Sequence, residues 1–505
     1  MIKKGNFTKT DLDQLVENEI EIEEATRQLN QLRNPPPPAR LERACSRGDG
    51  VVQLHEEDHE SLIDSWSELV STRSIIKFVP ASGAASRMFK SLEADQRPSD
   101  AVDQFIGNLK RFPFFGQLRE SLEVQGSDLG ELVLLQQNSK IVAHLLNSEG
   151  LGYSSIPKGL IPFHAYSDGV RSALVEHLIE GAPYIALGGK QSKFHFTVSP
   201  SHITDFQNAV QEAIPSVEGR IDRQILVEFS TQNSATNTLA IDEFGNPIRQ
   251  EDGSLLLRPS GHGALIDNLD QLQADVVFIK NIDNVAPSRA HEDTVLWKRL
   301  LAGYLAKLQQ RTFELLDELE ARPASRTVLD SALEFVHTRF SPSRPSDLSN
   351  DDSATQRHYV LDRLKRPIRV AGMVQNSNEP GGGPFWVKMA DGSLTAQIVE
   401  RSQVDLDQPG QREIWASSTH LNPVDLVCSL TDRQGKSFQF GLYVDPDTAF
   451  VTRKSHAGAS LTALERPGLW NGAMAGWNTV FVEVPNSTFT PVKTVFDLLR
   501  PAHQP

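Results

Sequence analysis

Several loops in this sequence place small residues and charged side chains where a strand should end. The stretch VPASGAASRMFK (79–90) follows the β-branched residues Ile75 and Ile76 and runs into a predicted helix. Small residues let the main chain approach a ligand closely, free N–H groups at a helix start favour an anion, and Arg87 could bind a phosphate. A tight strand–helix turn with a surface arginine is the alternative. The stretch contains only one glycine, Gly83, and has neither the GxGxxG nor the P-loop pattern. The sequence therefore allows both interpretations, the anion-binding loop and the tight turn.

Two lysines and one aspartate offer further contacts to phosphate and metal. Lys158 lies in IPKGLIPFH (156–164) and Lys493 in FTPVKTVFDLL (489–499). The ammonium group of a lysine is a compact positive charge that can bind a phosphate. A lysine in a turn or near the start of a helix is, however, more often a solvated surface residue. Asp283 ends the apolar run of FIKNIDNV (278–285). A carboxylate at the tip of a buried strand can hold magnesium, and we favour this over a simple Asp-Asn turn because the apolar run is so long.

Three more loops suit a base and a sugar. In RPSGHGALIDNL (258–269), Gly261 and Gly263 flank His262. This segment could form a flat surface against which a base stacks, or it could be the ordinary start of a helix. EPGGGPFWV (379–387) allows close main-chain approach, and Glu400 could bind sugar hydroxyls. A glycine-rich hairpin with an exposed glutamate is the alternative. STHLNPVDLV (418–427) offers Asn422 and Asp425 as oxygen ligands.

The elements around these loops predict an α/β fold. Helices are expected over 11–33, ended by four prolines, over 58–71, from about 80 to 150, and over 291–338. Strands are expected over 75–79, 193–199, 224–230 and 275–283, and a turn-rich linker over 341–353 precedes a strand-rich part over 366–500. Strands interleaved with helices predict a mostly parallel sheet, in which ligands bind at the carboxyl ends of the strands.

The bulk composition excludes several classes of protein. The chain has 505 residues and a formal net charge of −15, which argues against a nucleic-acid-binding protein with its basic surface. Its two cysteines, Cys45 and Cys428, are too few and too far apart for a disulfide framework or a zinc site. The sequence shows no signal peptide and no apolar run of about 18 residues, so we expect a cytoplasmic protein that does not cross a membrane.

Taken in order, the motifs resemble those of sugar-1-phosphate nucleotidyltransferases, the UDP-sugar pyrophosphorylases in particular. SGAASRM resembles their signature loop, with Ala81 and Ser82 in place of two glycines and Ala85–Ser86 in place of Gly-Thr. PKGL, FTVS, VEFSTQ, PSGHGAL, NIDN, IVERSQ and FTPVKTVFDLL resemble further segments, and the set spans residues 79–499. The resemblance implies a Rossmann-like nucleotidyltransferase fold with a mixed, mostly parallel sheet. It also implies a helical N-terminal extension (1–72) and a catalytic domain (73–500) with helical insertions at about 95–150 and 290–340.

The resemblance also implies a role for each candidate residue. Arg87, Lys158 and Lys493 would contact the phosphates, and Asp283 and Asp425 would hold Mg²⁺. The nucleotide would be bound by Ser82, Gly83, Ala84, Ala85, Ser86, Gly261, His262 and Gly263. The sugar would be bound by Glu379, Gly382, Gly383, Glu400 and Asn422.

The implied reaction joins a nucleoside triphosphate, with UTP expected, to a sugar 1-phosphate, and gives a nucleotide-diphosphate sugar and pyrophosphate. Such chemistry needs positioning and charge neutralisation rather than a protein nucleophile. The absence of a GxSxG elbow is consistent with this. Two alternatives stay open: a glycosyltransferase that uses a nucleotide sugar, and a nucleotide-sugar-binding protein without activity. The sequence indicates neither the sugar nor the oligomeric state.

Overall fold

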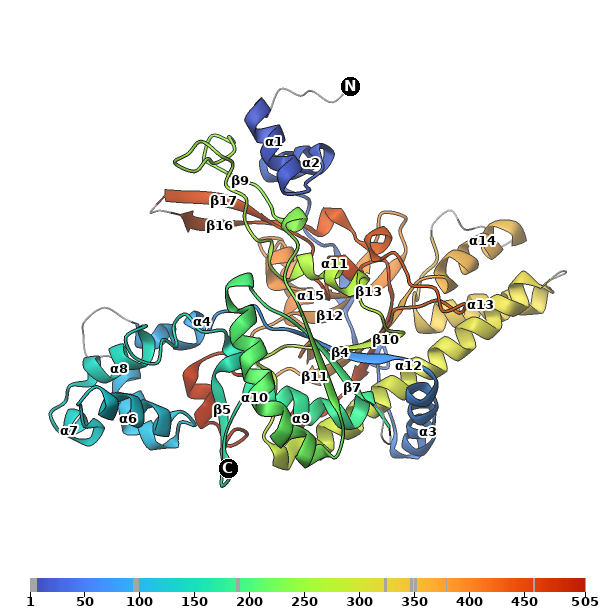
Figure 1. The fold of residues 1–505 in the computed structure, drawn as a ribbon. Helices are drawn as coiled ribbons and strands as arrows, with labels where there is room; N and C mark the ends of the chain where they lie inside the picture. The colour runs from blue at the N-terminus through green and yellow to red at the C-terminus, as the bar shows by residue number, and fades with distance from the viewer. Residues whose placement is uncertain are drawn as a thin grey trace. The chain divides into compact units, whose positions relative to one another are not determined.

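The chain folds into two compact units that each combine segments distant in sequence (Figure 1). The computed structural model describes residues 7–93, 100–187, 191–321, 325–345, 348, 352–377, 379–456 and 459–504. Unit 1 comprises Met1–Leu69, Thr231–Val277 and Leu301–Glu483, and unit 2 comprises Val70–Ser230, Phe278–Leu300 and Val484–Pro505.

Unit 2 is built around one part of the large sheet. Its strands follow the order β10 (Val276–Lys280, from Phe278 on in this unit), β4 (Ile75–Pro80), β7 (Ser192–Thr197) and β8 (Ile225–Ser230). β4 and β7 run parallel, as do β7 and β8. All but the last residue of β4 are buried, including Lys77. Strands this apolar are typical of a parallel sheet that is covered on both faces.

Helices and a hairpin complete unit 2. α9 (Ala173–Ile185) packs against β4 and β7, and Gly181 permits this approach, because a Cβ there would lie 2.6 Å from the ring of Phe194. α9 follows a hairpin of β5 (Pro162–Tyr166) and β6 (Gly169–Ser172), and the Ser172 side chain accepts a hydrogen bond from the Val175 N–H at its start. The other helices of this unit are α4 (Ser86–Phe89), α5 (Asp100–Gly107), α6 (Phe115–Val124), α7 (Leu129–Leu134), α8 (Asn138–Leu146), α10 (Ile203–Ile221) and the first turns of α12 (His291–Glu320).

Unit 1 contains three sheets. The largest has the order β2 (Ser46–Arg47), β3 (Gly50–Val52), β18 (Asn478–Glu483), β11 (Ile368–Gln375) and β15 (Asp425–Ser429), and β14 (His420–Leu421) also pairs with β11. β11 is parallel to β18 and antiparallel to β15. The second sheet joins β1 (Leu41–Ala44), β12 (Gly383–Lys388) and β13 (Leu394–Val399). The third joins β16 (Phe450–His456), β17 (Ala459–Glu465) and β9 (Ala240–Ile241).

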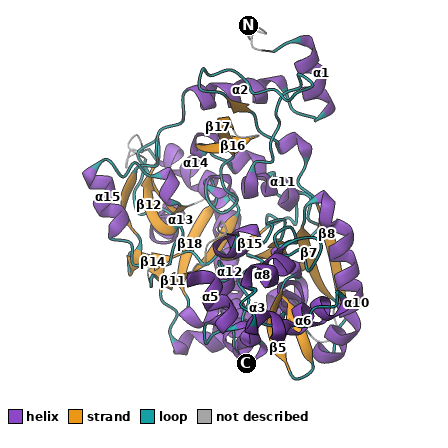
Figure 2. Cartoon of the chain, turned by 90° about the vertical axis from the view of Figure 1, so that its left-hand side faces the viewer, coloured by secondary structure: helices purple, strands orange, loops and turns teal. Residues whose placement is uncertain are grey.

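The helices of unit 1 pack against these sheets or against one another. α1 (Lys9–Glu17) and α2 (Ile22–Arg33) share one apolar cluster with Leu239, Leu255 and Leu464, and α2 lies over the third sheet (Figure 2). The others are most of α3 (Glu56–Thr72), α11 (Leu265–Asp270), α12 from Leu301 on, α13 (Arg326–Arg339), α14 (Ser353–Leu364) and α15 (Pro409–Ala416). Among the described residues, no helix combines the length and the apolar character that a membrane span needs.

The predicted fold class is confirmed, since the structure mixes helices with a mostly parallel central sheet. The helices expected near 95–150 and 290–340 are present. The predicted helix over 11–33 is two helices, because the chain turns at Glu19, which adopts a φ of 57°. The strand expected over 275–283 ends at Lys280, so Asp283 lies in the turn that follows. The division into an extension (1–72) and a catalytic domain (73–500) stays a prediction.

Candidate functional site

Three charged side chains meet after the β10 strand of unit 2. Lys158 Nζ lies 3.0 Å from Asp283 Oδ2 and donates to the Val492 carbonyl at 2.9 Å. Lys493 Nζ lies 3.6 Å from the same Asp283 oxygen. The Lys158 side chain is 13% exposed and that of Asp283 12%, whereas that of Lys493 is 45% exposed. The structure thus brings together three of the predicted residues, two ammonium groups around one carboxylate.

The C-terminal segment is tied to the loop after β10 by main-chain and side-chain hydrogen bonds. The Val492 N–H donates to the Asp283 carbonyl at 3.0 Å, and the Thr490 N–H donates to Asn284 Oδ1 at 3.0 Å. Asn284 also forms an isolated antiparallel bridge with Pro491. These contacts determine the position of Lys493, although it lies more than 200 residues from Asp283 in the sequence.

The loop after β4 is tied to the segment that carries Lys158. The Lys158 N–H donates to the Gly83 carbonyl at 3.1 Å, and the Ala85 N–H donates to the Ile156 carbonyl at 3.0 Å. Ala84 forms an antiparallel bridge with Pro157 between these two hydrogen bonds. The loop after β4 therefore lies beside Lys158.

The same loop presents an open surface of small residues. Ser82, Gly83, Ala84 and Ser86 are exposed, whereas Ala85 is buried. A Cβ added at Gly83 would have no neighbour within 4 Å, so the main chain there is accessible to a ligand.

Arg87 lies in the four-residue helix α4, which starts at Ser86. It is exposed, and within the described part of the chain its guanidinium makes no hydrogen bond or ion pair. The structure therefore leaves Arg87 available to an anion.

A layer of buried charges lies under these loops. Glu180 of α9 accepts from Lys77 of β4 at 3.2 Å and from Lys280 of β10 at 2.7 Å. All three side chains are at most 1% exposed. Burial opposes ionisation of Glu180, but the two lysines outweigh it and hold its pKa well below the usual range. Burial lowers the pKa of Lys77 to about 8. Glu180 thus joins the two strands from which the loops of Gly83 and Asp283 emerge.

Asp283 has the properties of a ligand for a hard cation. Its Oδ1 atom is buried and has no hydrogen-bond partner within the described segments, which is unusual for a carboxylate oxygen. Among the described residues there is no group of three or more His, Cys, Asp or Glu side chains that could hold a metal. The donor set therefore fits Mg²⁺ bound through one carboxylate, with water and substrate phosphate as further ligands, and does not fit an all-protein metal site.

Unit 1 contains the residues predicted to bind the sugar. A Cβ at Gly382 would lie 2.9 Å from Glu400 Oε1, and the Asn422 N–H donates to the Gly382 carbonyl at 2.8 Å. Gly383 is the first residue of β12, and a Cβ there would lie 3.1 Å from the His420 carbonyl oxygen. Glu379 lies in the loop that precedes β12. The structure therefore gathers Gly382, Glu400 and Asn422 in one place.

Asn422 begins a strained turn. Its Oδ1 accepts from the Val424 N–H, and Val424 adopts a φ of 57°, which is strained for a β-branched residue. Asp425, the second predicted metal ligand, is the buried first residue of β15 in the same unit. Asp283 belongs to the other unit, and a shared metal site stays a prediction.

The loop predicted to face a base also lies in unit 1. Gly263 is required by close packing, because a Cβ there would lie 2.4 Å from the Pro467 carbonyl oxygen. The His262 ring stacks on Trp470 at 4.1 Å and its Nδ1 accepts from the Leu469 N–H. Burial lowers the pKa of His262 to about 4, so the ring is neutral. Gly261 is exposed with a φ of 69°. A role of this loop in base binding stays a prediction.

The sequence reasoning missed the residues that support the site from below. They are Lys77, Glu180 and Lys280, described above, together with His164, Glu176, His177 and His503. One signal was available. The segment ALVEHLIEGAPYI (173–185) is strongly apolar but carries two glutamates and a histidine, and charges within an apolar helix indicate buried polar contacts.

Comparison with known proteins gives a family and similar folds. No curated protein matches the chain. UDP-N-acetylglucosamine pyrophosphorylase from Trypanosoma brucei is similar at 13% identity and a TM-score of 0.47, over 98% of this chain and 79% of that one. A mutant UDP-glucose pyrophosphorylase from Leishmania major is similar at 11% identity and a TM-score of 0.45, over 97% and 78% of the two chains. A family model described as a domain of unknown function, DUF4301, matches residues 8–504, and the chain therefore belongs to this family.

Proposed function

We propose that this protein is a nucleotidyltransferase that joins a nucleoside triphosphate and a sugar 1-phosphate. The observation that carries the proposal is the convergence of Lys158 and Lys493 on Asp283, beside the exposed loop of Gly83. Two ammonium groups around one carboxylate leave an excess positive charge, which suits a ligand rich in phosphate. The order of motifs along the sequence, which resembles that of UDP-sugar pyrophosphorylases, favours UTP as the nucleotide.

In this proposal an oxygen of the sugar 1-phosphate attacks the α-phosphorus of the triphosphate, and pyrophosphate leaves. Lys158, oriented by Asp283 and the Val492 carbonyl, contacts the α-phosphate, and Lys493 contacts the sugar phosphate. Arg87 contacts the departing pyrophosphate. Fixed charges of this kind stabilise the charge that develops in the transition state, and each typically contributes on the order of 10²–10³ in rate.

Magnesium is the proposed cofactor. Asp283 would hold it through Oδ1, which has no hydrogen-bond partner among the described residues. When bound, the ion would neutralise charge on the phosphates. Glu379, Gly382, Gly383, Glu400 and Asn422 are the proposed sugar-binding residues.

The reverse reaction tests the proposal most directly. The protein is incubated with pyrophosphate, Mg²⁺ and a panel of nucleotide-diphosphate sugars, and release of the nucleoside triphosphate is measured. A pyrophosphorylase releases UTP from the matching UDP-sugar, whereas a glycosyltransferase or a binding protein releases none. Lys493→Met should lose most of this activity, and Lys110→Met, which changes an exposed lysine elsewhere in unit 2, should retain it. Failure to release a triphosphate from any member of the panel, or equal activity of the two variants, would contradict the proposal.

A further inference from the structure

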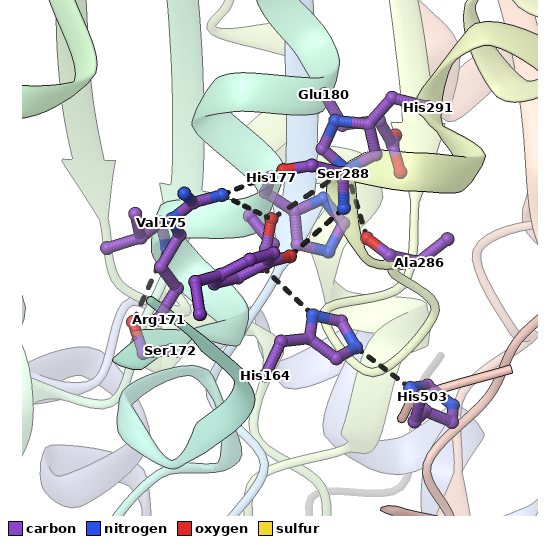
Figure 3. A network of polar contacts seen from close by, with 12 residues as sticks. His164, Arg171, Ser172, Val175, His177, Glu180, Ala286, Ser288, His291 and His503 are labelled. Carbon is purple, nitrogen blue, oxygen red and sulfur yellow. Dashed lines mark hydrogen bonds and ion pairs between the residues drawn. The ribbon is translucent and has the colours of Figure 1, made fainter. Parts of the chain in front are cut away.

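Two histidines of unit 2 hold the segment 282–288, which lies between β10 and α12 (Figure 3). His177 Nε2, from α9, lies 3.1 Å from the Ile282 carbonyl oxygen, and His291 Nε2, at the start of α12, lies 3.0 Å from the Ala286 carbonyl oxygen. A carbonyl oxygen only accepts hydrogen bonds, so both rings donate from Nε2. The segment is therefore tied to both helices through its main chain.

The direction of the Asp283 side chain depends on the two peptide groups that flank its Cα atom. Each peptide group is planar, so only φ and ψ of Asp283 can turn its side chain relative to them. The peptide group after Asp283 is held twice. Its carbonyl accepts from the Val492 N–H at 3.0 Å, and its N–H, which belongs to Asn284, donates to the Asn281 carbonyl at 3.1 Å. The main chain alone therefore fixes this plane.

The peptide group before Asp283 is held only once. Its carbonyl, that of Ile282, accepts from His177, and its N–H, that of Asp283, makes no hydrogen bond with any described residue. His177 is thus the single hydrogen-bond partner of this peptide group in the described part of the chain. With both planes held, φ and ψ of Asp283 are fixed, and so is the direction in which its side chain leaves the main chain. That direction brings its carboxylate to 3.0 Å from Lys158 Nζ.

The place of His177 in the core has a cost in stability. Its side chain is 0% exposed, and burial together with the charge of Lys77 holds its pKa well below the usual range, so the ring is neutral. A neutral ring that donates from Nε2 has a lone pair on Nδ1, and this atom has no hydrogen-bond partner among the described residues. A buried acceptor without a donor is destabilising. The unpaired nitrogen offsets the hydrogen bond to Ile282, so stability alone gives little reason for a histidine here.

We propose that His177 is a positioning residue, which fixes the peptide group before Asp283 and thereby holds the Asp283 carboxylate toward Lys158 and toward the proposed metal. The part of this proposal that concerns the metal and turnover rests on the proposed nucleotidyltransferase function. The part that concerns the contact between Asp283 and Lys158 does not.

Three substitutions of His177 separate its donor from its volume. His177→Gln keeps a donor near the place of Nε2, whereas His177→Asn has its amide near the place of Nδ1, too far from Ile282 to donate. His177→Met keeps the volume and removes both nitrogens. His291→Asn is the matched control, because it removes the donor to Ala286 in the same segment but leaves the peptide groups of Asp283 untouched. Circular dichroism measures folding. If His177→Gln alone of the three folded, His177 would be a folding residue, and the proposal would be overturned.

The first experiment needs no catalysis. Lys158→Met is combined with each variant, and urea unfolding of the full-length protein measures how far it lowers the unfolding midpoint in each background. We expect this loss to fall by about half or more in His177→Asn and His177→Met, because an Asp283 carboxylate that is no longer held can turn away from Lys158. The loss should match that of wild type in His177→Gln and His291→Asn. An equal loss in all backgrounds would overturn the proposal.

The second experiment measures the Mg²⁺ dependence of the reverse reaction. His177→Asn and His177→Met should raise the Mg²⁺ concentration at half-maximal rate by about 10–100-fold, the range typical of residues that orient a metal ligand from behind. His177→Gln and His291→Asn should stay within a few-fold of wild type. A rise of the same size in His177→Gln would show that the donor is not what matters, and would overturn the proposal.

The two experiments distinguish this proposal from the proposed function. If the wild-type protein releases no triphosphate, the proposed function fails, and the urea measurements still decide the role of His177. If the wild-type protein is active and the Mg²⁺ dependence is the same in every variant, the proposed function stands and His177 has no positioning role.

Discussion

The carboxylate of Asp283 should oppose phosphate binding whenever no metal is present. Asp283→Asn keeps the volume of the side chain but removes a negative charge 3.0 Å from Lys158 Nζ and 3.6 Å from Lys493 Nζ. A phosphate oxygen that accepts from either ammonium would lie roughly 6 Å or less from that charge, given ordinary hydrogen-bond lengths. At an effective dielectric constant of about 40, removing it favours binding by about 1.4 kcal/mol, or about tenfold.

The variant should therefore separate phosphate affinity from turnover. We expect Asp283→Asn to bind inorganic pyrophosphate about tenfold more tightly than wild type in EDTA at low salt, measured by titration calorimetry. Its Mg²⁺-dependent turnover should fall by on the order of 10²–10³. Circular dichroism confirms folding, and Asp205→Asn, at an exposed aspartate of α10, is the matched control. Unchanged or weaker metal-free binding of pyrophosphate would refute this account of the site, as would near-wild-type turnover at modest Mg²⁺ concentration.

Three further outcomes follow from the same structure. Lys158→Met should lower the free energy of unfolding by about 1–3 kcal/mol, because the largely buried Asp283 carboxylate then keeps the ion pair with the more exposed Lys493 and loses the one with Lys158. Lys493→Met should change the free energy of unfolding by less than about 0.5 kcal/mol, and urea unfolding of both variants measures the difference. Arg87→Ala should leave the unfolding midpoint unchanged, because the side chain is exposed and makes no ion pair with any described residue, but it should slow turnover by on the order of 10². A rate within a few-fold of wild type would remove Arg87 from the mechanism. His262 has a pKa of about 4 in the folded protein and about 6.5 in the unfolded chain, so its neutral ring stabilises the fold fully above pH 6.5. This contribution declines as the pH falls from 6.5 toward 4, and about 2 kcal/mol of the free energy of unfolding should be lost between pH 7.5 and 5. His262→Asn should flatten this pH dependence.

Much of the architecture was predictable because it depends on local patterns. The apolar, β-branched runs at 75–79 and 275–280 form β4 and β10, and the helical spacing near 95–150 forms α5–α8. Ends of elements were harder to predict. β10 stops at Lys280 because the following residues form a turn, with the Asn284 N–H bonded to the Asn281 carbonyl. The charge of Lys280 is compatible with a buried strand only because Glu180, 100 residues earlier, neutralises it.

The candidate site was predictable in part for a topological reason. Loops that follow parallel strands meet at one edge of the sheet, so the loops of Gly83 and Asp283 were expected to lie near each other. The position of Lys493 could be expected only from the resemblance to a family, because it depends on contacts between residues more than 200 positions apart. The ion pair between Lys158 and Asp283 was not predicted. Sequence spacing does not show whether a lysine faces a ligand or an acidic side chain of its own chain.

The layer of charges beneath the loops is better explained by positioning than by stability. Removing a charged group from water costs several kcal/mol, and apolar residues of similar volume are often as stabilising as a buried ion pair. Unit 2 nevertheless buries Lys77, Glu180 and Lys280 together. An apolar layer could fill the same space, but it would allow β4, α9 and β10 to slide against one another, because apolar contacts have little directionality. The hydrogen-bonded ion pairs of Glu180 with Lys77, at 3.2 Å, and with Lys280, at 2.7 Å, allow no such sliding. The strands that end in the loops of Gly83 and Asp283 are therefore held in one register, and a site built from separate parts of the chain requires this.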